Sequence, residues 1–151
     1  MSVLIEELRL IVDAFHRHEI DFALCGGLAV AAHRLVRATQ DVDFLILEES
    51  LEKAFIAAAE VGYDIRGLDI SLKERTVEIS RVSKIVGEDV ISLDLLLVTP
   101  RFEDVWEGRE NREFAGEALA VVSRAGLIKM KRQAGRPQDL ADIERLENEE
   151  S

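Results

Sequence analysis

The sequence contains only one cysteine, Cys25, in 151 residues, so it cannot form a disulfide within the chain. Disulfides belong to oxidising compartments, and a lone cysteine therefore favours a reducing one. The first ten residues carry acids and lack the basic segment that opens a secretory signal. We expect a cytoplasmic protein.

Long apolar runs and an excess of basic residues are also missing. No uncharged apolar stretch approaches the ~20 residues that a transmembrane helix needs, so we expect no membrane association. The formal net charge is −11. Such a charge disfavours a broad nucleic-acid-binding surface, because the phosphate backbone is itself negative.

The remaining composition is that of an ordinary globular protein, with 48% hydrophobic and 32% charged residues. The length suits one hydrophobic core, and no repeat or linker divides the chain. We expect residues 1–151 to form a single domain.

Hydrophobic periodicity predicts helices that alternate with strands. Apolar residues at helical spacing predict a first helix over residues 3–18, and Leu140, Ile143 and Leu146 predict the buried face of the last one. The fold class we expect is α/β (α+β), with a central mixed sheet of about five strands flanked by helices. The predicted strands are 20–25, 41–47, 75–82, 91–98 and 118–122, and the other predicted helices are 28–36, 51–62, 126–134 and 137–148.

Two carboxylates interrupt the apolar strand DVDFLIL at 41–47. Side chains two residues apart on a strand share a face, so Asp41 and Asp43 lie side by side. Their mutual repulsion raises a pKa or lowers stability unless a cation compensates, and paired oxygen ligands suit Mg²⁺. The alternative is a strand edge on which both carboxylates are simply solvated.

A third acid, Asp94, stands in the middle of the apolar strand ISLDLLLV at 91–98. An acid in such a run is rarely buried without a partner. If this strand pairs with the 41–47 strand, Asp94 can face Asp41 and Asp43. Three converging carboxylates are typical of sites that hold Mg²⁺ for phosphoryl or nucleotidyl transfer; a solvent-facing edge residue is the alternative.

The pair Gly26-Gly27 stands where a strand gives way to a helix. Glycine permits a tight turn and a close approach of a ligand to the backbone, and the following helix offers free N–H groups to an anion. Most such pairs are merely turns. Beside a carboxylate cluster, however, these amides would supply the phosphate-binding half of a nucleotide site.

The segment 124–136 (RAGLIKMKRQAGR) carries five basic residues and no acid in an otherwise acidic chain. Lys129, Lys131, Arg132 and Arg136 are candidates for a phosphate-facing patch. The alternative is an exposed helix face with cations placed favourably near a helix C-terminus.

Together these residues resemble the nucleotidyltransferase superfamily with the DNA polymerase β-type palm. The resemblance rests on Gly26-Gly27, on Asp41-Val42-Asp43 after thirteen intervening residues, and on Asp94 in a later strand. The segment RATQDVD is similar to the Arg-x-Thr-x-Asp-apolar-Asp segment of small prokaryotic AbiEii-toxin-like and minimal nucleotidyltransferases. The ending LIKMKRQAGRPQDLADIERL is similar to their lysine-rich helix and the Gly-Arg-Pro-x-Asp-Leu-x-Asp motif that follows it.

The resemblance implies a role for each matching residue. Asp41 and Asp43 would coordinate Mg²⁺, with Mn²⁺ as the alternative metal, and Asp94 would complete the metal site and help to deprotonate the attacking hydroxyl. The residues implied to hold the nucleotide and its phosphates are Gly26, Gly27, Arg37, Thr39 and Lys131. Asp139 and Asp142 would fix the final pair of helices.

The activity we expect is Mg²⁺-dependent transfer of a nucleoside monophosphate from an NTP such as ATP to a hydroxyl acceptor. An RNA end, a protein and a small molecule are all open as acceptors. Larger relatives carry an additional region for the acceptor, which would make activity here depend on a partner protein or a homo-oligomer. The alternatives are a non-catalytic nucleotide-binding component of a toxin–antitoxin pair, a partner-binding module, or a merely metal-stabilised domain.

Overall fold

The computed structural model describes residues 2–32, 41–67, 70–72 and 77–148. Eight strands form one mixed sheet, in the order β3-β5-β6-β2-β1-β8-β7, and β4 also pairs with β5. The strands are β1 (Phe22–Cys25), β2 (Asp41–Ile46), β3 (Ile65–Arg66), β4 (Ile70–Leu72), β5 (Val77–Val86), β6 (Asp89–Leu97), β7 (Glu110–Phe114) and β8 (Glu117–Val121). The α-helices are α1 (Ser2–Arg17), α2 (Gly26–Ala32), α3 (Leu51–Glu60), α4 (Glu103–Glu107), α5 (Arg124–Ala134) and α6 (Pro137–Asn148).

The predicted fold class is confirmed, whereas the predicted number of about five strands was too low. The five predicted strands correspond to β1, β2, β5, β6 and β8. The additional strands β3 and β4 are only two and three residues long, and β7 (ENREF) is polar except for Phe114. Such segments lack the apolar alternation that reveals a strand in a sequence, and only pairing with a neighbour fixes them.

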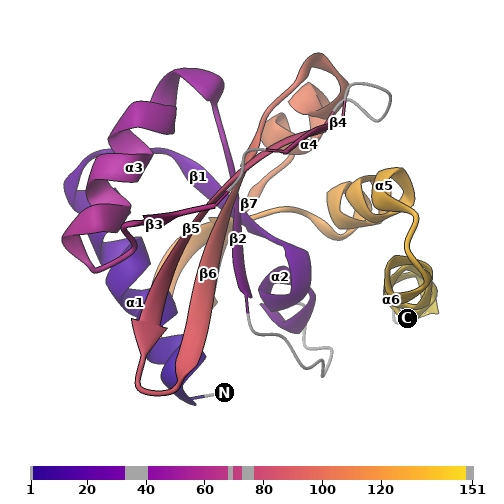
Figure 1. Ribbon diagram of the computed structural model, residues 1–151. Coiled ribbons are helices and arrows are strands. Elements are labelled where there is room, and N and C mark those ends of the chain that lie inside the picture. Colours follow the sequence, from indigo (N-terminus) through magenta and orange to yellow (C-terminus); the bar gives the residue numbers. More distant parts are fainter. Residues whose placement is uncertain (1, 33–40, 68–69, 73–76, 149–151) are drawn as a thin grey trace.

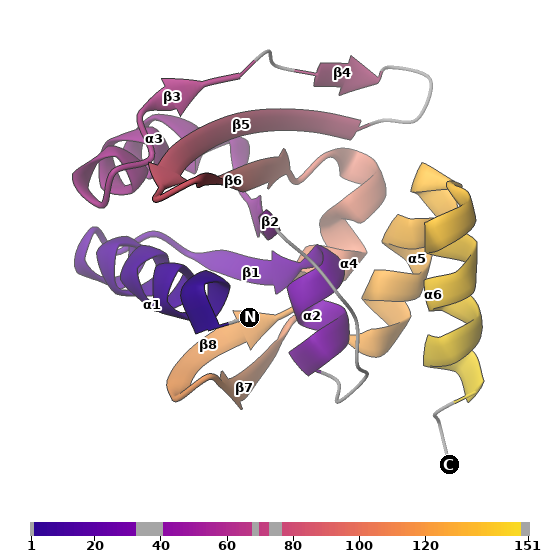
Figure 2. The ribbon, with the colours of Figure 1, turned by 60° about the horizontal axis from the view of Figure 1, so that its bottom comes forward.

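Helices cover the sheet from two sides. In Figures 1 and 2, α1 and α3 lie against one face, and α2, α5 and α6 lie on the other side. Alternate residues of β6 follow this division, since Leu93 and Leu95 are fully buried, whereas Asp94 belongs to the opposite face. No helix among the described residues combines the length and apolar composition that crossing a bilayer requires.

The core beside α1 is built around three phenylalanines. The Phe22 and Phe44 rings stack with centroids 4.3 Å apart, and Phe15 of α1 meets Phe44 edge-on at 5.2 Å. Phe15 and Phe44 are fully buried. Truncating a buried phenylalanine typically costs about 3–5 kcal/mol, so this packing fixes β1 and β2 together and thereby the position of the acids on β2.

The last helix has the predicted bounds, and α5 ends where predicted but begins two residues earlier, at Arg124. The Ser123 hydroxyl accepts a hydrogen bond from the Gly126 amide at the start of α5, and Gly135 ends α5 in the left-handed conformation with φ 66°. The buried face of α6 was predicted only in part. Ile143 and Leu146 are buried, but Leu140 is 57% exposed, and the space against α5 is taken by ion pairs of aspartates instead.

Candidate functional site

Strand pairing brings the three predicted acids onto one face of the sheet. β2 and β6 run parallel with Asp43 beside Asp94 and Asp41 beside Ser92. Because side chains alternate along a strand, Asp41, Asp43 and Asp94 all project from the face opposite the α1 and α3 layer. The predicted convergence of Asp94 with the Asp-x-Asp pair is therefore present in the structure.

Gly26 lies directly against this cluster. Antiparallel pairing of β1 with β2 sets Cys25 beside Asp43, and Gly26 follows with φ 67°. A Cβ atom on Gly26 would lie 2.6 Å from Cγ of Asp43, which is too close for any side chain. The glycine is thus required twice, by its left-handed backbone and by the Asp43 carboxylate packed against it. Gly27 is the second residue of α2.

An arginine that sequence reasoning did not single out completes the cluster. Arg81 of β5 lies opposite Asp94 in the antiparallel β5–β6 pair and donates from Nε to Oδ1 at 2.6 Å and from Nη2 to Oδ2 at 2.9 Å. Its Nη2 is also 3.9 Å from Oδ2 of Asp41. Asp94 is only 8% exposed, and this two-pronged ion pair is the partner that a buried carboxylate needs.

The hairpin turn is the signal that could have revealed Arg81. Gly87 and Glu88 form a two-residue connection between β5 and β6, and such a connection fixes the register of the pair. Arg81 stands six residues before Gly87, and Asp94 stands six residues after Glu88. A prediction of the turn would therefore have placed the two side chains opposite each other.

Among the described residues, the ion pairs of this cluster are made by Arg81, and the charge of Lys131 partly offsets the repulsion at Asp43. Burial raises the pKa of Asp43 to about 7, with the charges of Asp94 and Asp41 adding to the rise. Burial also raises the pKa of Asp41, as does the charge of Asp94, while Arg81 opposes that change. Full ionisation of the three carboxylates is therefore unfavourable, and a further cation would offset their mutual repulsion.

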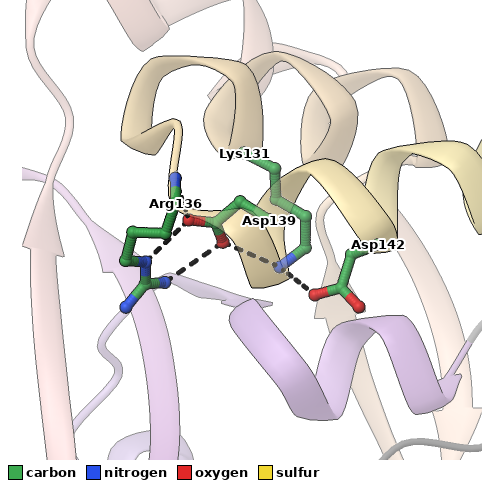
Figure 3. Close-up of polar contacts among 4 residues, drawn as sticks. All are labelled: Lys131, Arg136, Asp139 and Asp142. Carbon is green, nitrogen blue, oxygen red and sulfur yellow. Dashed lines mark hydrogen bonds and ion pairs between the residues drawn. The ribbon is translucent and has the colours of Figure 1, made fainter.

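Lys131 takes part in a second ionic group, shown in Figure 3. Its side chain runs from α5 towards α6, where Nζ lies 3.0 Å from Oδ2 of Asp142 and 3.7 Å from Oδ1 of Asp139. Arg136 donates to both oxygens of Asp139, from Nε at 2.6 Å and from Nη2 at 3.1 Å. These contacts join α5 to α6, and Lys131 is only 6% exposed.

The other predicted basic residues also have acidic partners. Lys129 binds Asp104 of α4 at 2.8 Å, and Arg132 binds Glu147 of α6 at 2.6 Å, both at the surface. Lys129, Lys131 and Arg132 of α5 are therefore spread over separate ion pairs rather than gathered in one patch. This distribution favours the alternative of an exposed helix face for Lys129 and Arg132. Arg37 and Thr39 lie outside the described residues.

The carboxylates of the cluster are suitable ligands for a hard divalent cation, but their side chains are not arranged around a common metal position. Within the described part of the chain, no three acidic, histidine or cysteine side chains are arranged to hold a metal ion as they are. Both oxygens of Asp94 are directed at Arg81. Three neighbouring carboxylates, one with a pKa raised to about 7, nevertheless fit the chemistry of Mg²⁺ or Mn²⁺.

The sequence matches no protein-family model and no curated protein sequence. Solved structures do match the fold. The protein TM1012 of Thermotoga maritima, assigned as a nucleotidyltransferase, superposes with a TM-score of 0.65 at 16% identity over 94% of this chain and 91% of that one. This chain has the nucleotidyltransferase fold.

Two antibiotic-modifying enzymes share the same fold. The lincosamide antibiotic adenylyltransferase LnuA, solved with lincomycin bound, gives a TM-score of 0.62 at 16% identity over 94% of this chain and 95% of that one. ANT(2″)-Ia, solved in complex with adenylyl-2″-tobramycin, gives a TM-score of 0.62 at 14% identity over 94% and 86%. At these identities the likeness concerns the fold alone.

Proposed function

We propose that the protein is a nucleotidyltransferase that moves a nucleoside monophosphate from an NTP to a hydroxyl acceptor in a Mg²⁺-dependent reaction. The observation that carries this proposal is the convergence of Asp41, Asp43 and Asp94 beside the turn at Gly26, where burial and the neighbouring carboxylates raise the pKa of Asp43 to about 7. Clustered carboxylates are costly to the fold, which makes them a reason to look for a ligand. The shared fold of the adenylyltransferases supports the same reaction class.

The roles proposed for the residues follow their positions. Asp41 and Asp43 would hold the metal, with Asp94 as a third ligand, and Gly26 and Gly27 would bring backbone N–H groups to the phosphates. Bound Mg²⁺ would stabilise negative charge on the α-phosphate and the leaving pyrophosphate. The acceptor oxygen would bond to the α-phosphorus as the bond to pyrophosphate breaks, and Asp94 would take the hydroxyl proton.

We place the protein among the chains similar to AbiEii-like and minimal nucleotidyltransferases with a polymerase β-type palm, on the segments RATQDVD and GRPQDLAD. For the acceptor we favour a small-molecule hydroxyl. This chain matches 95% of LnuA, whose structure contains a small antibiotic, so a fold of this extent can accommodate such an acceptor. The net charge of −11 disfavours a long RNA.

A thermal-shift titration of each NTP, with and without Mg²⁺, tests the nucleotide site directly. A ligand at 100 times its dissociation constant adds about 2.7 kcal/mol, which raises the melting temperature by several degrees. We expect a Mg²⁺-dependent rise in the wild type and none in Asp43→Asn. Asp89→Asn, an exposed change on β6, is the matched control and should behave as the wild type. No rise with any NTP would contradict the proposal.

A second candidate function is nucleotide binding without transfer, as in a non-catalytic toxin–antitoxin component or a partner-binding module. The observation that favours it is the engagement of both Asp94 oxygens by Arg81. This candidate predicts the same thermal shift but no release of pyrophosphate with any hydroxyl acceptor. Co-purification with a neighbour-encoded chain would support it, and pyrophosphate release lost in Asp43→Asn would exclude it.

A further inference from the structure

The carboxylate cluster already contains one cation, and that cation belongs to the protein. Arg81 binds both oxygens of Asp94 at 2.6 and 2.9 Å and reaches to 3.9 Å from Asp41. A divalent cation bound by the same carboxylates would need the Asp94 oxygen atoms and the negative charge that the Arg81 guanidinium now binds.

Arg81 and a metal ion therefore compete for Asp94. Bidentate binding leaves few lone pairs on the carboxylate for a metal, and two cations in one place repel each other. The competition can be resolved because the Arg81 side chain is 47% exposed, while that of Asp94 is only 11% exposed. The arginine can turn out to solvent, whereas the aspartate is held on a central strand.

We propose that Arg81 is a positioning residue. In the free protein it binds the Asp94 carboxylate oxygens that a metal ion would use, and it moves away from Asp94 when a divalent cation binds. The inference rests on the proposed function, since it assumes that Asp94 is a metal ligand. It makes two statements about the free protein: Arg81 holds the Asp94 side chain in place, and it lowers the affinity for a divalent cation that arrives alone.

Binding of Mn²⁺ in the absence of nucleotide, followed by the electron paramagnetic resonance signal of the free ion, tests the proposal without any catalytic assay. We expect Arg81→Gln to bind Mn²⁺ about tenfold more tightly than the wild type, equivalent to about 1.4 kcal/mol. This is the scale of a charge-assisted hydrogen bond that no longer has to be broken. Arg81→Lys should show a smaller gain, because it keeps the charge but loses the two-pronged geometry.

Two further variants separate competition from a general change in charge. Arg17→Gln removes the same charge on α1, on the far side of the sheet, and should leave Mn²⁺ affinity unchanged. The double variant Arg81→Gln/Asp94→Asn should lose the gain, since the contested ligand is gone. Urea unfolding shows whether each variant is folded. If Arg81→Gln is not folded, Arg81→Lys takes its place in the comparison.

The outcomes distinguish this inference from the proposed function. Equal or weaker Mn²⁺ binding by Arg81→Gln, with a Mg²⁺-dependent NTP shift intact in the wild type, overturns the role of Arg81 and leaves the nucleotidyltransferase proposal standing. Failure of wild type and variant to bind Mn²⁺, with or without NTP, overturns both. A gain that persists in the double variant also overturns the inference, because Asp94 would then not be the contested ligand.

Discussion

The molecule contains two ionic groups that differ in their balance of charge. In the first, three acids on β2 and β6 (Asp41, Asp43 and Asp94) lie together, and among the described residues Arg81 pairs with Asp94 and Asp41 while Lys131 attracts Asp43 from farther away. In the second, between α5 and α6, two bases meet two acids: Lys131 and Arg136 bind Asp139 and Asp142. Each group has a buried part and an exposed part: Asp94, Lys131, Asp139 and Asp142 are buried, whereas the side chains of Asp41, Arg81 and Arg136 are partly exposed.

The difference in balance separates a candidate binding site from a structural contact. A balanced buried group is satisfied within the protein, and removing one member leaves a charge without its partner. An unbalanced group destabilises the free protein and gains from a ligand of opposite charge. We therefore expect changes in the first group to alter ligand binding and changes in the second to alter stability.

Asp43→Asn should produce the largest effect. It removes a proposed metal ligand without changing the size of the side chain, and we expect nucleotidyl transfer to fall by at least about 1,000-fold, because a bound metal contributes several kcal/mol to the transition state. Labelled NTP and a panel of small hydroxyl acceptors provide the assay. Transfer at the wild-type rate would show that the unbalanced group is not a catalytic site.

Lys131→Met should act on stability instead. Breaking a buried ion pair on one side costs about 3–5 kcal/mol, since Asp142 would remain buried next to an apolar side chain. The midpoint of urea unfolding measures the change, and Arg132→Gln, a surface pair on the same helix, should cost less than about 1 kcal/mol. If Lys131→Met unfolds like the wild type but binds NTP weakly, Lys131 belongs to the nucleotide site and the comparison fails.

The pH dependence of stability should reveal the unbalanced group in the metal-free protein. Asp43 has a pKa of about 7 in the folded state, above its value in the unfolded chain, so the folded state holds a proton that the unfolded state releases. Stability conferred by this proton is present at low pH and is lost as pH rises towards 7.

The wild type should consequently be less stable than Asp43→Asn by on the order of 2 kcal/mol at about pH 8, and the two should converge near pH 4. Urea unfolding across this range, in the presence of a chelator, measures the difference. A difference that does not vary with pH would mean that Asp43 is not held protonated by its neighbours.

Gly26→Ala should have a moderate effect on stability and a clear effect on the site. An alanine at φ 67° costs about 1–2 kcal/mol, and its Cβ would displace the Asp43 carboxylate. We expect Mg²⁺-dependent NTP stabilisation to be lost while the protein stays folded. Gly116→Ala has a similar backbone conformation and open space for a Cβ, so it controls for the backbone cost alone.

The sequence by itself determined the fold class, five of the strands, the end of α5 and the limits of α6. It also determined that Asp41 and Asp43 share a face, because the two-residue period of a strand is a local property. The strong apolar runs 41–47 and 91–98 predicted strands, and the acids within them indicated either a shared partner or a solvated edge; the structure pairs the two strands. Local chemistry was sufficient for these conclusions.

Only the tertiary structure decided which partner each charge would have. Arg81 meets Asp94 through a cross-strand register, and Lys131 meets Asp142 through the packing of α5 on α6. The same packing buries Asp139 and Asp142 and leaves Leu140 exposed, against the apolar pattern of α6. The energy of a charge depends on every group within a few ångströms, and those groups come from distant parts of the chain.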